Sequence, residues 1–173
     1  MENEEITRCL SRIRNGDGAA LEALYEGLKT PAYTVILRIT QDAQEAEDVL
    51  QGLFVKLYKS PPEGKIQNPR AYILQSARNM ALDSVRSRRE ALPLDLLGET
   101  EKPAEHDAEL RLDIEDALSS LGLSDRQIVA LHLNGGLTFR ETAEIMDIPL
   151  GTVLWRYGRA LKALREKLSG GSI

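Results

Sequence analysis

The stretch TFRETAEIMDIPLGTVLWRYGRALKALREKL, residues 138–168, decides the fold of the C-terminal part of this chain. Its first half places Phe139, Ala143 and Met146 on one face of a helix, because residues three or four apart are helix neighbours. Its second half repeats apolar residues at helical spacing, and these form the expected core face: Val153, Tyr157, Ala160, Leu161, Leu164 and Leu168. Two amphipathic helices joined by the short segment 148–151 predict a helix-turn-helix, although an ordinary helical hairpin has a similar pattern.

The second of these helices is basic, and its basic residues are Arg156, Arg159, Lys162, Arg165 and Lys167. With Val153 facing the core, a rotation of about 100° per residue turns Trp155 and Arg159 to the opposite face. Lys162 joins them there, and Leu154 and Arg156 fall on the two flanks. An exposed tryptophan between basic side chains indicates a contact surface. A basic second helix favours DNA as the partner, since a recognition helix enters the major groove.

Helical signals recur along the rest of the chain, whereas strand signals are almost absent. An oxygen-bearing residue followed three positions later by Glu or Gln predicts three capping boxes: Asp42 with Glu45, Ser124 with Gln127, and Thr138 with Glu141. Asn68 followed by Pro69 predicts a fourth helix start. The proline pair at 61–62 and the glycine pair at 135–136 predict helix ends. The sequence therefore predicts an all-α protein.

Charge divides the chain into three parts. The formal net charge is -5, yet residues 65–90 carry six basic and two acidic side chains, and residues 152–168 carry five and one. Residues 91–112 carry six acidic side chains against two basic ones, with Pro and Gly interrupting any pattern. We predict two small helical domains, residues 1–90 and 113–173, joined by a flexible acidic linker over residues 91–112.

Composition argues against several classes of function. With a single cysteine, Cys9, the chain cannot build a disulfide framework or a thiolate metal site. Its two histidines, His106 and His132, have no spacing that suggests a ligand pair or a catalytic triad. We therefore expect no metal, no cofactor and no enzymatic activity. The acidic N-terminus lacks a signal-peptide pattern, and no apolar run approaches the roughly 20 residues of a membrane helix. We expect a cytoplasmic protein without stable membrane insertion.

Four segments, in this order, resemble the sigma factors of bacterial RNA polymerase, especially the small extracytoplasmic-function (ECF) group. They are IRNGDGAALEALYEGL (13–28), DAQEAEDVLQGLFVKLY (42–58), NPRAYILQSARNMALDSVRSRRE (68–90) and LSSLGLSDRQIVALHLNGGLTFRETAEIMDIPLGTV (118–153). The resemblance implies a sigma region 2-like helical bundle and a region 4-like helix-turn-helix domain. It implies a promoter-specificity subunit that binds core RNA polymerase, recognises promoter elements and promotes DNA melting. The expected partners are the clamp helices of the largest polymerase subunit, promoter DNA and an anti-sigma factor.

The resemblance also implies site residues in the first domain. The Asp-x-x-Gln-x-x-Phe pattern assigns polymerase binding to Asp48, Gln51 and Phe54, with a core role for Phe54 as the alternative. Gly52 stands where the family usually has an acidic residue. A glycine inside a helix lowers the stability of that helix by about 1 kcal/mol relative to alanine. The promoter-melting segment assigns DNA contacts to polar, aromatic and basic residues: Gln67, Asn68, Arg70, Tyr72, Arg78, Asn79, Arg86, Arg88 and Arg89.

These DNA contacts have alternatives. Asn68 can be a helix N-cap without a role in DNA binding. Tyr72 can belong to the core, and the arginines can form a solvated face. Tyr72 stands where a tryptophan is commoner in the family, which keeps a ring but changes its size. In the linker, carboxylates that imitate a nucleic-acid backbone are candidate contacts to basic polymerase surfaces: Asp95, Glu99, Glu101, Glu105, Asp107 and Glu109.

In the second domain, the resemblance assigns reading of the upstream promoter element to the basic helix. Its candidate DNA-binding residues are Thr152, Leu154, Trp155, Arg156, Arg159 and Lys162. Arginines bind guanine edges or phosphates, and apolar side chains contact thymine methyl groups. The alternative for Trp155 is packing on the other domain or on an inhibitor. Asp147 stands at the turn where glycine is usual, and Asp tolerates the left-handed conformation better than most residues.

Two other functions remain open on the sequence. One is a stand-alone helix-turn-helix regulator that binds DNA without polymerase. The other is a sigma-like protein-interaction module, suggested by the departures at Gly52, Leu154 and Trp155. A net charge of -5 disfavours nonspecific attraction to DNA phosphates, and so favours a protein that meets DNA within a larger complex.

Overall fold

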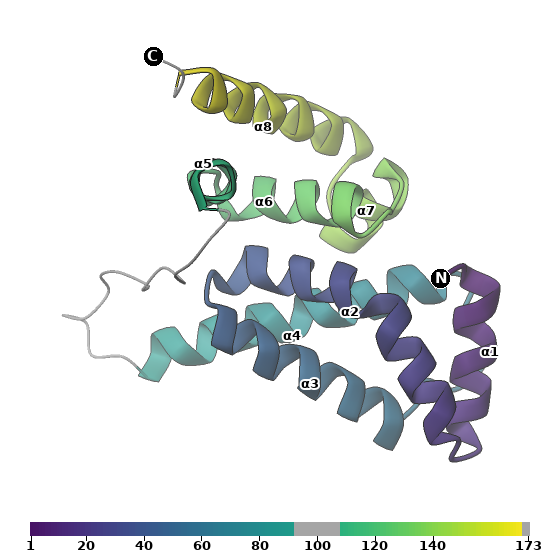
Figure 1. The fold of residues 1–173 in the computed structure, drawn as a ribbon. Coiled ribbons are helices and arrows are strands. Elements are labelled where there is room, and N and C mark those ends of the chain that lie inside the picture. Colours follow the sequence, from purple (N-terminus) through teal and green to yellow (C-terminus); the bar gives the residue numbers. More distant parts are fainter. Residues whose placement is uncertain (92–107, 171–173) are drawn as a thin grey trace. The chain divides into compact units, whose positions relative to one another are not determined.

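The computed structural model describes residues 1–91 and 108–170, with side chains described for 1–91 and 114–169. The chain divides between residues 97 and 98 into two compact units (Figure 1). All the regular elements in the described ranges are helices, as the sequence predicts.

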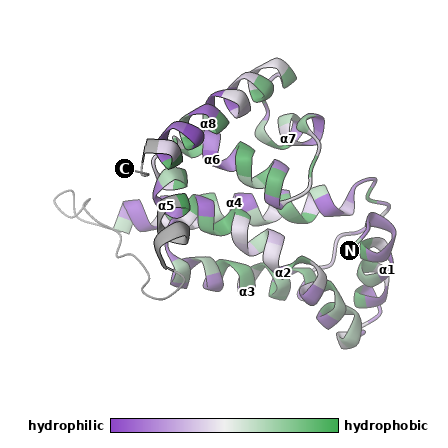
Figure 2. Ribbon diagram, turned by 45° about the horizontal axis from the view of Figure 1, so that its top comes forward, coloured by the Kyte–Doolittle hydropathy of each residue, from purple (hydrophilic) through white to green (hydrophobic). Residues whose placement is uncertain are grey.

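The first unit consists of four helices: α1 (Asn3–Arg14), α2 (Gly18–Thr40), α3 (Ala43–Lys59) and α4 (Pro69–Ala91). Helix α2 packs against the other three, so its own buried side chains form the centre of the unit. Leu24, Leu28 and Ile36 of α2 are fully buried, as are Ile73 and Leu74 of α4. Hydrophobic and hydrophilic residues alternate in bands along these helices (Figure 2), because α1, α3 and α4 each bury one face and expose the other.

The predicted start and end of α3 and the predicted start of α4 are confirmed. The Asp42 carboxylate accepts a hydrogen bond from the backbone N–H of Glu45 at 2.7 Å, and Asn68 Oδ1 accepts one from that of Ala71 at 3.0 Å. Helix α3 ends at Lys59, just before the proline pair at 61–62. The reciprocal half of the predicted Asp42 box is absent, since the Glu45 side chain bonds to residues of α4 instead.

The second unit follows the order α5 (Ala108–Ser119), α6 (Leu123–Val129), η2 (Ala130–Asn134), α7 (Phe139–Met146) and α8 (Leu150–Gly170). Helix α6 runs directly into η2, a π-helical turn that ends at Asn134 and has Gly135 as its C-cap. Gly136 follows with a φ of 70°, the conformation expected of a glycine after a helix. The Thr138–Glu141 capping box at the start of α7 is confirmed in both directions.

The Ser124–Gln127 capping box is wrong. Helix α6 begins at Leu123, because Gly122 already adopts the extended N-cap conformation. Ser124 is therefore inside the first turn, and Gln127 is buried in the unit.

The predicted linker is too long at both ends. Ala91 is the last residue of α4, and the backbone of residues 108–112 belongs to α5, so Glu109 lies in a helix. The other five acidic candidates lie outside the described residues: Asp95, Glu99, Glu101, Glu105 and Asp107.

Gly52 faces α4, where a Cβ atom added to it would lie 3.3 Å from the Met80 Cε atom. This methyl group ends a flexible side chain, so it can move by a few tenths of an ångström. We therefore expect Gly52→Ala to stabilise the first unit by up to about 1 kcal/mol through helix propensity. Thermal unfolding followed by circular dichroism measures the change. As a control, Gly52→Ile adds a bulk that Met80 cannot accommodate and should lose the gain. A lower midpoint for the alanine variant would show that α3 needs glycine to approach α4.

Candidate polymerase- and DNA-binding surfaces

The outward face of α3 combines polar and apolar side chains. Asp48 and Gln51 are exposed on it, as expected. Val55 and Tyr58, which the sequence reasoning missed, are 50% and 44% exposed. The four residues, called the α3 face below, recur every three or four positions and so share one side of the helix. The sequence could have indicated a contact surface here, because a face that meets only solvent would carry polar residues at the positions of Val55 and Tyr58.

Phe54 requires a correction. Its side chain is 5% exposed and packs edge-to-face on Tyr25, with ring centroids 4.9 Å apart. Six residues after Asp48, the helix has turned by about 240°, which points Phe54 into the core. Phe54 is therefore a core residue, the alternative given above, and Val55 and Tyr58 are the apolar side chains that α3 presents outward.

The outward face of α4 carries part of the expected DNA-binding set. Its members, called the α4 face below, are Tyr72, Arg78, Asn79, Arg86 and Arg89. Asn79, Arg86 and Arg89 are exposed, whereas Tyr72 and Arg78 are half-buried. Arg78 donates to Asn79 Oδ1 at 3.3 Å, and partial burial lowers the pKa of its guanidinium. Arg86 forms a solvent-exposed ion pair with Asp83 at 3.9 Å.

Two expected DNA contacts point into the protein instead. Arg70 Nη1 donates to the Met1 carbonyl at 3.2 Å. Arg88 pairs with Glu45 and also donates to the Thr40 carbonyl at 3.4 Å. Arg70 and Arg88 are eighteen residues apart, which is five full helical turns, so they lie on the same side of α4. That side faces the rest of the unit, and both arginines hold α4 to its neighbours.

The loop before α4 contains the last two candidates of the first unit. Gln67 is exposed and available to a partner. Asn68 is half-buried, and its amide oxygen accepts the Ala71 N–H, so its N-cap role is confirmed. A contact between Asn68 and DNA stays a prediction.

The helix-turn-helix forms as predicted. Ala143 and Val153 are buried together with Ile128, and Ile148 packs against them in the angle between α7 and α8. Asp147 ends α7 in the left-handed conformation, with a φ of 53°.

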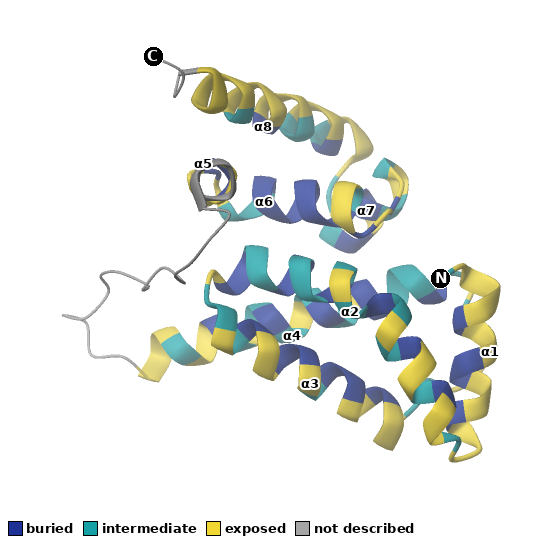
Figure 3. Ribbon diagram, viewed as in Figure 1, coloured by how far each residue is buried: buried dark blue, intermediate teal, exposed yellow. Residues whose placement is uncertain are grey.

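The apolar side of α8 is narrower than predicted. Val153 and Ala160 are buried, and Tyr157 and Leu164 are half-buried against them. Leu161 and Leu168, which we predicted to be core residues, are exposed. Figure 3 shows that most of α8 is exposed, with buried and intermediate residues along one side. Ala160 is buried in a cluster with Leu118, Leu121 and Val129, and Leu161 is turned away from it by about 100°.

The outward side chains of α8 are linked to one another. Trp155 is 61% exposed, and the Arg159 guanidinium lies over its ring, 4.6 Å from the centroid. Arg156 Nη1 bonds to Asp125 Oδ1 at 3.0 Å, and Arg159 bonds to the other oxygen of that carboxylate. Asp125 was not among the predicted site residues, because it lies more than thirty positions earlier in the chain.

The remaining candidates on α8 differ in their surroundings. Leu154 is exposed on the flank. Lys162 is exposed and lies 3.8 Å from Glu166, one turn further along. Thr152 is half-buried in the first turn. Of the six candidates on this helix, only the two arginines form ion pairs with another helix in the described part of the chain.

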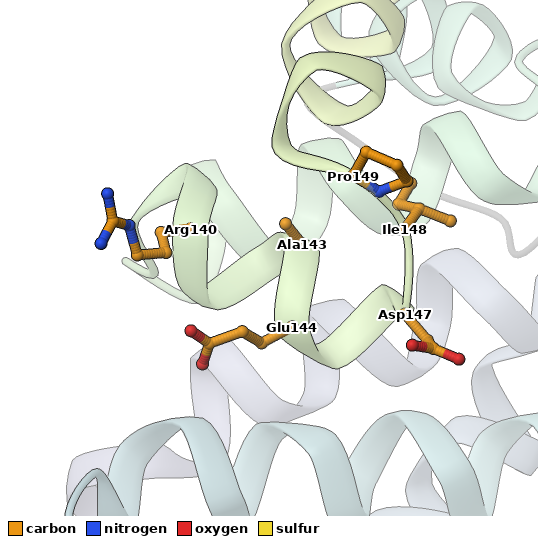
Figure 4. Close-up of a pocket in the computed structure, with 6 residues that line it drawn as sticks. All are labelled: Arg140, Ala143, Glu144, Asp147, Ile148 and Pro149. Carbon is orange, nitrogen blue, oxygen red and sulfur yellow. The ribbon is translucent and has the colours of Figure 1, made fainter.

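A shallow pocket lies beside the turn between α7 and α8, and it is lined by Arg140, Ala143, Glu144, Asp147, Ile148 and Pro149. Figure 4 shows that the side chains of Arg140 and Asp147 point away from each other. None of these six residues is a serine, cysteine or histidine, so the pocket offers no nucleophile with a base. In the described ranges, no three His, Cys, Asp or Glu side chains are grouped to hold a metal ion. No helix in those ranges has the length and apolar character to span a membrane.

Comparison with known proteins gives consistent matches along the chain. The family model "Sigma-70 region 2" matches residues 24–91, and "Sigma-70, region 4" matches residues 117–166. The ECF RNA polymerase sigma factor SigL of Mycobacterium tuberculosis (strain H37Rv) is 32% identical, over 88% of this chain and 90% of SigL. The ECF RNA polymerase sigma factor SigK of Mycobacterium ulcerans is 25% identical, over 96% of this chain and 95% of SigK.

Two solved structures share the fold. The sigma factor RpoE, in complex with the anti-sigma factor NepR from Bartonella quintana, superposes with a TM-score of 0.66 at 21% identity, covering 80% of this chain and 89% of RpoE. CnrH, in complex with the cytosolic domain of CnrY, superposes with a TM-score of 0.68 at 19% identity, covering 97% of this chain and 99% of CnrH.

The two kinds of arginine on α4 predict different effects on stability. The Glu45 carboxylate is largely buried and is held by Arg88 and by Ser84 Oγ at 2.6 Å. Arg88→Ala removes its charged partner, so we expect the unfolding free energy of the first unit to fall by roughly 1–3 kcal/mol. The control is Arg86→Ala, which removes an exposed pair and should change stability by no more than about 0.5 kcal/mol. Urea unfolding followed by circular dichroism measures both, and equal effects would contradict the assignment.

Proposed function

The chain belongs to the ECF RNA polymerase sigma factors, subunits that bind core RNA polymerase and promoter DNA to initiate transcription, and we propose that three of its surfaces divide this work. The α3 face binds the polymerase, the α4 face melts the promoter, and the outward side of α8 reads the upstream element. The observation that carries the proposal is the match of regions 2 and 4, in order, to two helical units that each present an outward basic helix.

The α3 face has the chemistry of a protein–protein contact. Exposed Val55 and Tyr58 provide apolar area, and Asp48 and Gln51 provide polar groups beside it, an arrangement typical of an interface. We assign this face to the clamp helices of the largest polymerase subunit. Gly52 is half-buried and faces Met80 of α4, so its lack of a side chain does not interrupt the α3 face.

The α4 face has the chemistry of a single-strand contact. Arg86 and Arg89 are exposed for phosphates, and Asn79 has an amide for a base or the backbone. Half-buried Tyr72 offers an aromatic ring for stacking, and Gln67 adds a polar group from the loop. The local positive charge of α4 compensates for the acidic balance of the whole chain.

On α8, each outward side chain suits one part of a DNA duplex. Arg156 and Arg159 suit guanine edges, and Lys162 suits a phosphate. Leu154 and Trp155 are apolar and exposed, and suit thymine methyl groups or sugar edges. Thr152 adds a hydroxyl for a phosphate in the first turn.

The chain acts in the cytoplasm, as a transcription initiation subunit rather than as an enzyme. An anti-sigma factor is a further partner, since the solved sigma factor RpoE is bound to the anti-sigma factor NepR. A stand-alone DNA-binding regulator is disfavoured, because residues 24–91 match the region 2 model.

The function is tested by adding the purified chain to core polymerase and measuring co-elution and run-off transcription from genomic promoters. Val55→Asp places a charge in the middle of the α3 face, so we expect at least about tenfold weaker core binding and a parallel loss of transcripts. The matched control, Ala23→Asp, places the same charge at an exposed site on α2 and should bind core normally. Co-elution of wild type with core but no promoter-specific transcript would contradict the function. Normal core binding by the Val55 variant would contradict the assignment of the α3 face.

Trp155→Ala tests the proposed role of α8. The variant loses an exposed ring that we assign to the upstream element, so we expect about a tenfold loss of preference for that element and unchanged core binding. Promoters selected from a randomised upstream library by wild-type holoenzyme supply the measurement. Leu168→Ala, an exposed change more than three turns further along α8, is the control. An unchanged promoter preference would leave Trp155 without a role in reading DNA.

A further inference from the structure

One buried carboxylate contacts the outward side of α8. Asp125 lies in the first turn of α6, and its side chain is 6% exposed. Its two oxygens bond separately to Arg156 and Arg159, so it bridges both guanidinium groups. The N-terminal turn of α6 also favours a negative charge at this position. The Asp125 carboxylate is therefore held in place by two arginines of α8.

The two arginines keep most of their hydrogen-bonding capacity. Each uses one terminal nitrogen on Asp125, whereas a guanidinium carries five N–H donors. The side chains of Arg156 and Arg159 remain 33% and 51% exposed. They are thus restrained in conformation while their remaining donors are accessible. Restraint of this kind removes part of the entropy cost that a long side chain pays on binding.

The restraint extends to Trp155 through Arg159. The Arg159 guanidinium lies between the Asp125 carboxylate and the face of the Trp155 ring. A cation over an aromatic face is attracted to it, so fixing Arg159 also limits the orientations of the ring. Asp125 in this way orders three of the side chains that α8 presents outward.

We propose that Asp125 is a positioning residue that pre-orients Arg156, Arg159 and Trp155 for sequence-specific reading of the upstream promoter element. The proposal rests on the proposed function of α8. Asp125 contributes specificity and not attraction, because its buried charge opposes that of the two arginines. Removing this charge therefore has two opposite effects: nonspecific affinity for DNA rises or stays constant, while discrimination between sequences falls.

The first test uses Trp155 as a probe in the full-length protein, because it is the chain's single tryptophan. Asp125→Asn keeps the size of the side chain and removes its charge. We expect greater quenching of Trp155 fluorescence by acrylamide and lower fluorescence anisotropy than in wild type. Asp147→Asn is the matched control, since it removes an equal charge from the same unit at a left-handed position that Asn tolerates. Unchanged quenching in Asp125→Asn would overturn the link from Asp125 to Trp155.

The second test measures DNA reading by holoenzyme reconstituted from the full chain and core polymerase. We expect Asp125→Asn to lower the binding ratio of selected to scrambled upstream elements by about tenfold, with core binding unchanged. A retained ratio with tighter binding overall would overturn the proposal, since Asp125 would then compete with DNA for the arginines.

A variant that lacks both arginines distinguishes a positioning role of Asp125 from a general effect on stability. In Arg156→Ala/Arg159→Ala protein, adding Asp125→Asn should not lower the ratio further, because the residues through which Asp125 acts are gone. A full additional loss there would assign Asp125 a merely structural role and overturn the proposal. Failure of wild-type holoenzyme to prefer any upstream element would instead refute the function of α8. The fluorescence result does not depend on that function, so the two failures are distinguishable.

Discussion

In α3, α4 and α8 one face of the helix is buried, and that constraint fixes which side chains remain for binding. In α4 the buried line runs through Ile73, Ala77 and Ala81, and it leaves Asn79 and Arg86 on the outside. In α8 the line runs through Val153 and Ala160. Because side chains advance by about 100° per residue, a shift of one position moves a residue from a binding surface to the core. The packing of two small cores therefore determines the binding surfaces as well as the fold.

The arginines of α4 show how strongly helical register decides which side chains are exposed. Arg86 and Arg88 are two positions apart, yet Arg86 is exposed and Arg88 is paired with Glu45. Local composition describes both as part of one basic cluster. The structure separates them, since one contributes charge to the surface and the other connects α4 to α3. Counting basic residues in a segment therefore overestimates the number that DNA can reach.

Much of this arrangement could be predicted from the sequence, because helix caps and apolar periodicity are local. The start of α4 after Asn68, the box at Thr138 and the left-handed Asp147 follow from residues a few positions apart. Contacts between residues far apart in the chain could not be predicted from the sequence. The burial of Phe54 follows from its position on α3, but its partner Tyr25 lies on another helix and does not follow from any local pattern. The contact between Asp125 and α8 depends on how α6 packs, which only the folded unit reveals.

Glu45 and Asp125 show one interaction used for two purposes. Each is a largely buried carboxylate on one helix that binds arginine on another. Around Glu45, both terminal nitrogens of Arg88 are used within the protein, on the carboxylate and on the Thr40 carbonyl, so its charge serves the fold. Around Asp125, one carboxylate is shared by two arginines, and each of them keeps donors for a partner. The number of arginines that share a carboxylate thus separates an arginine whose two terminal nitrogens are both used within the fold from two arginines that keep exposed donors, and that distinction depends on folded contacts rather than on net charge.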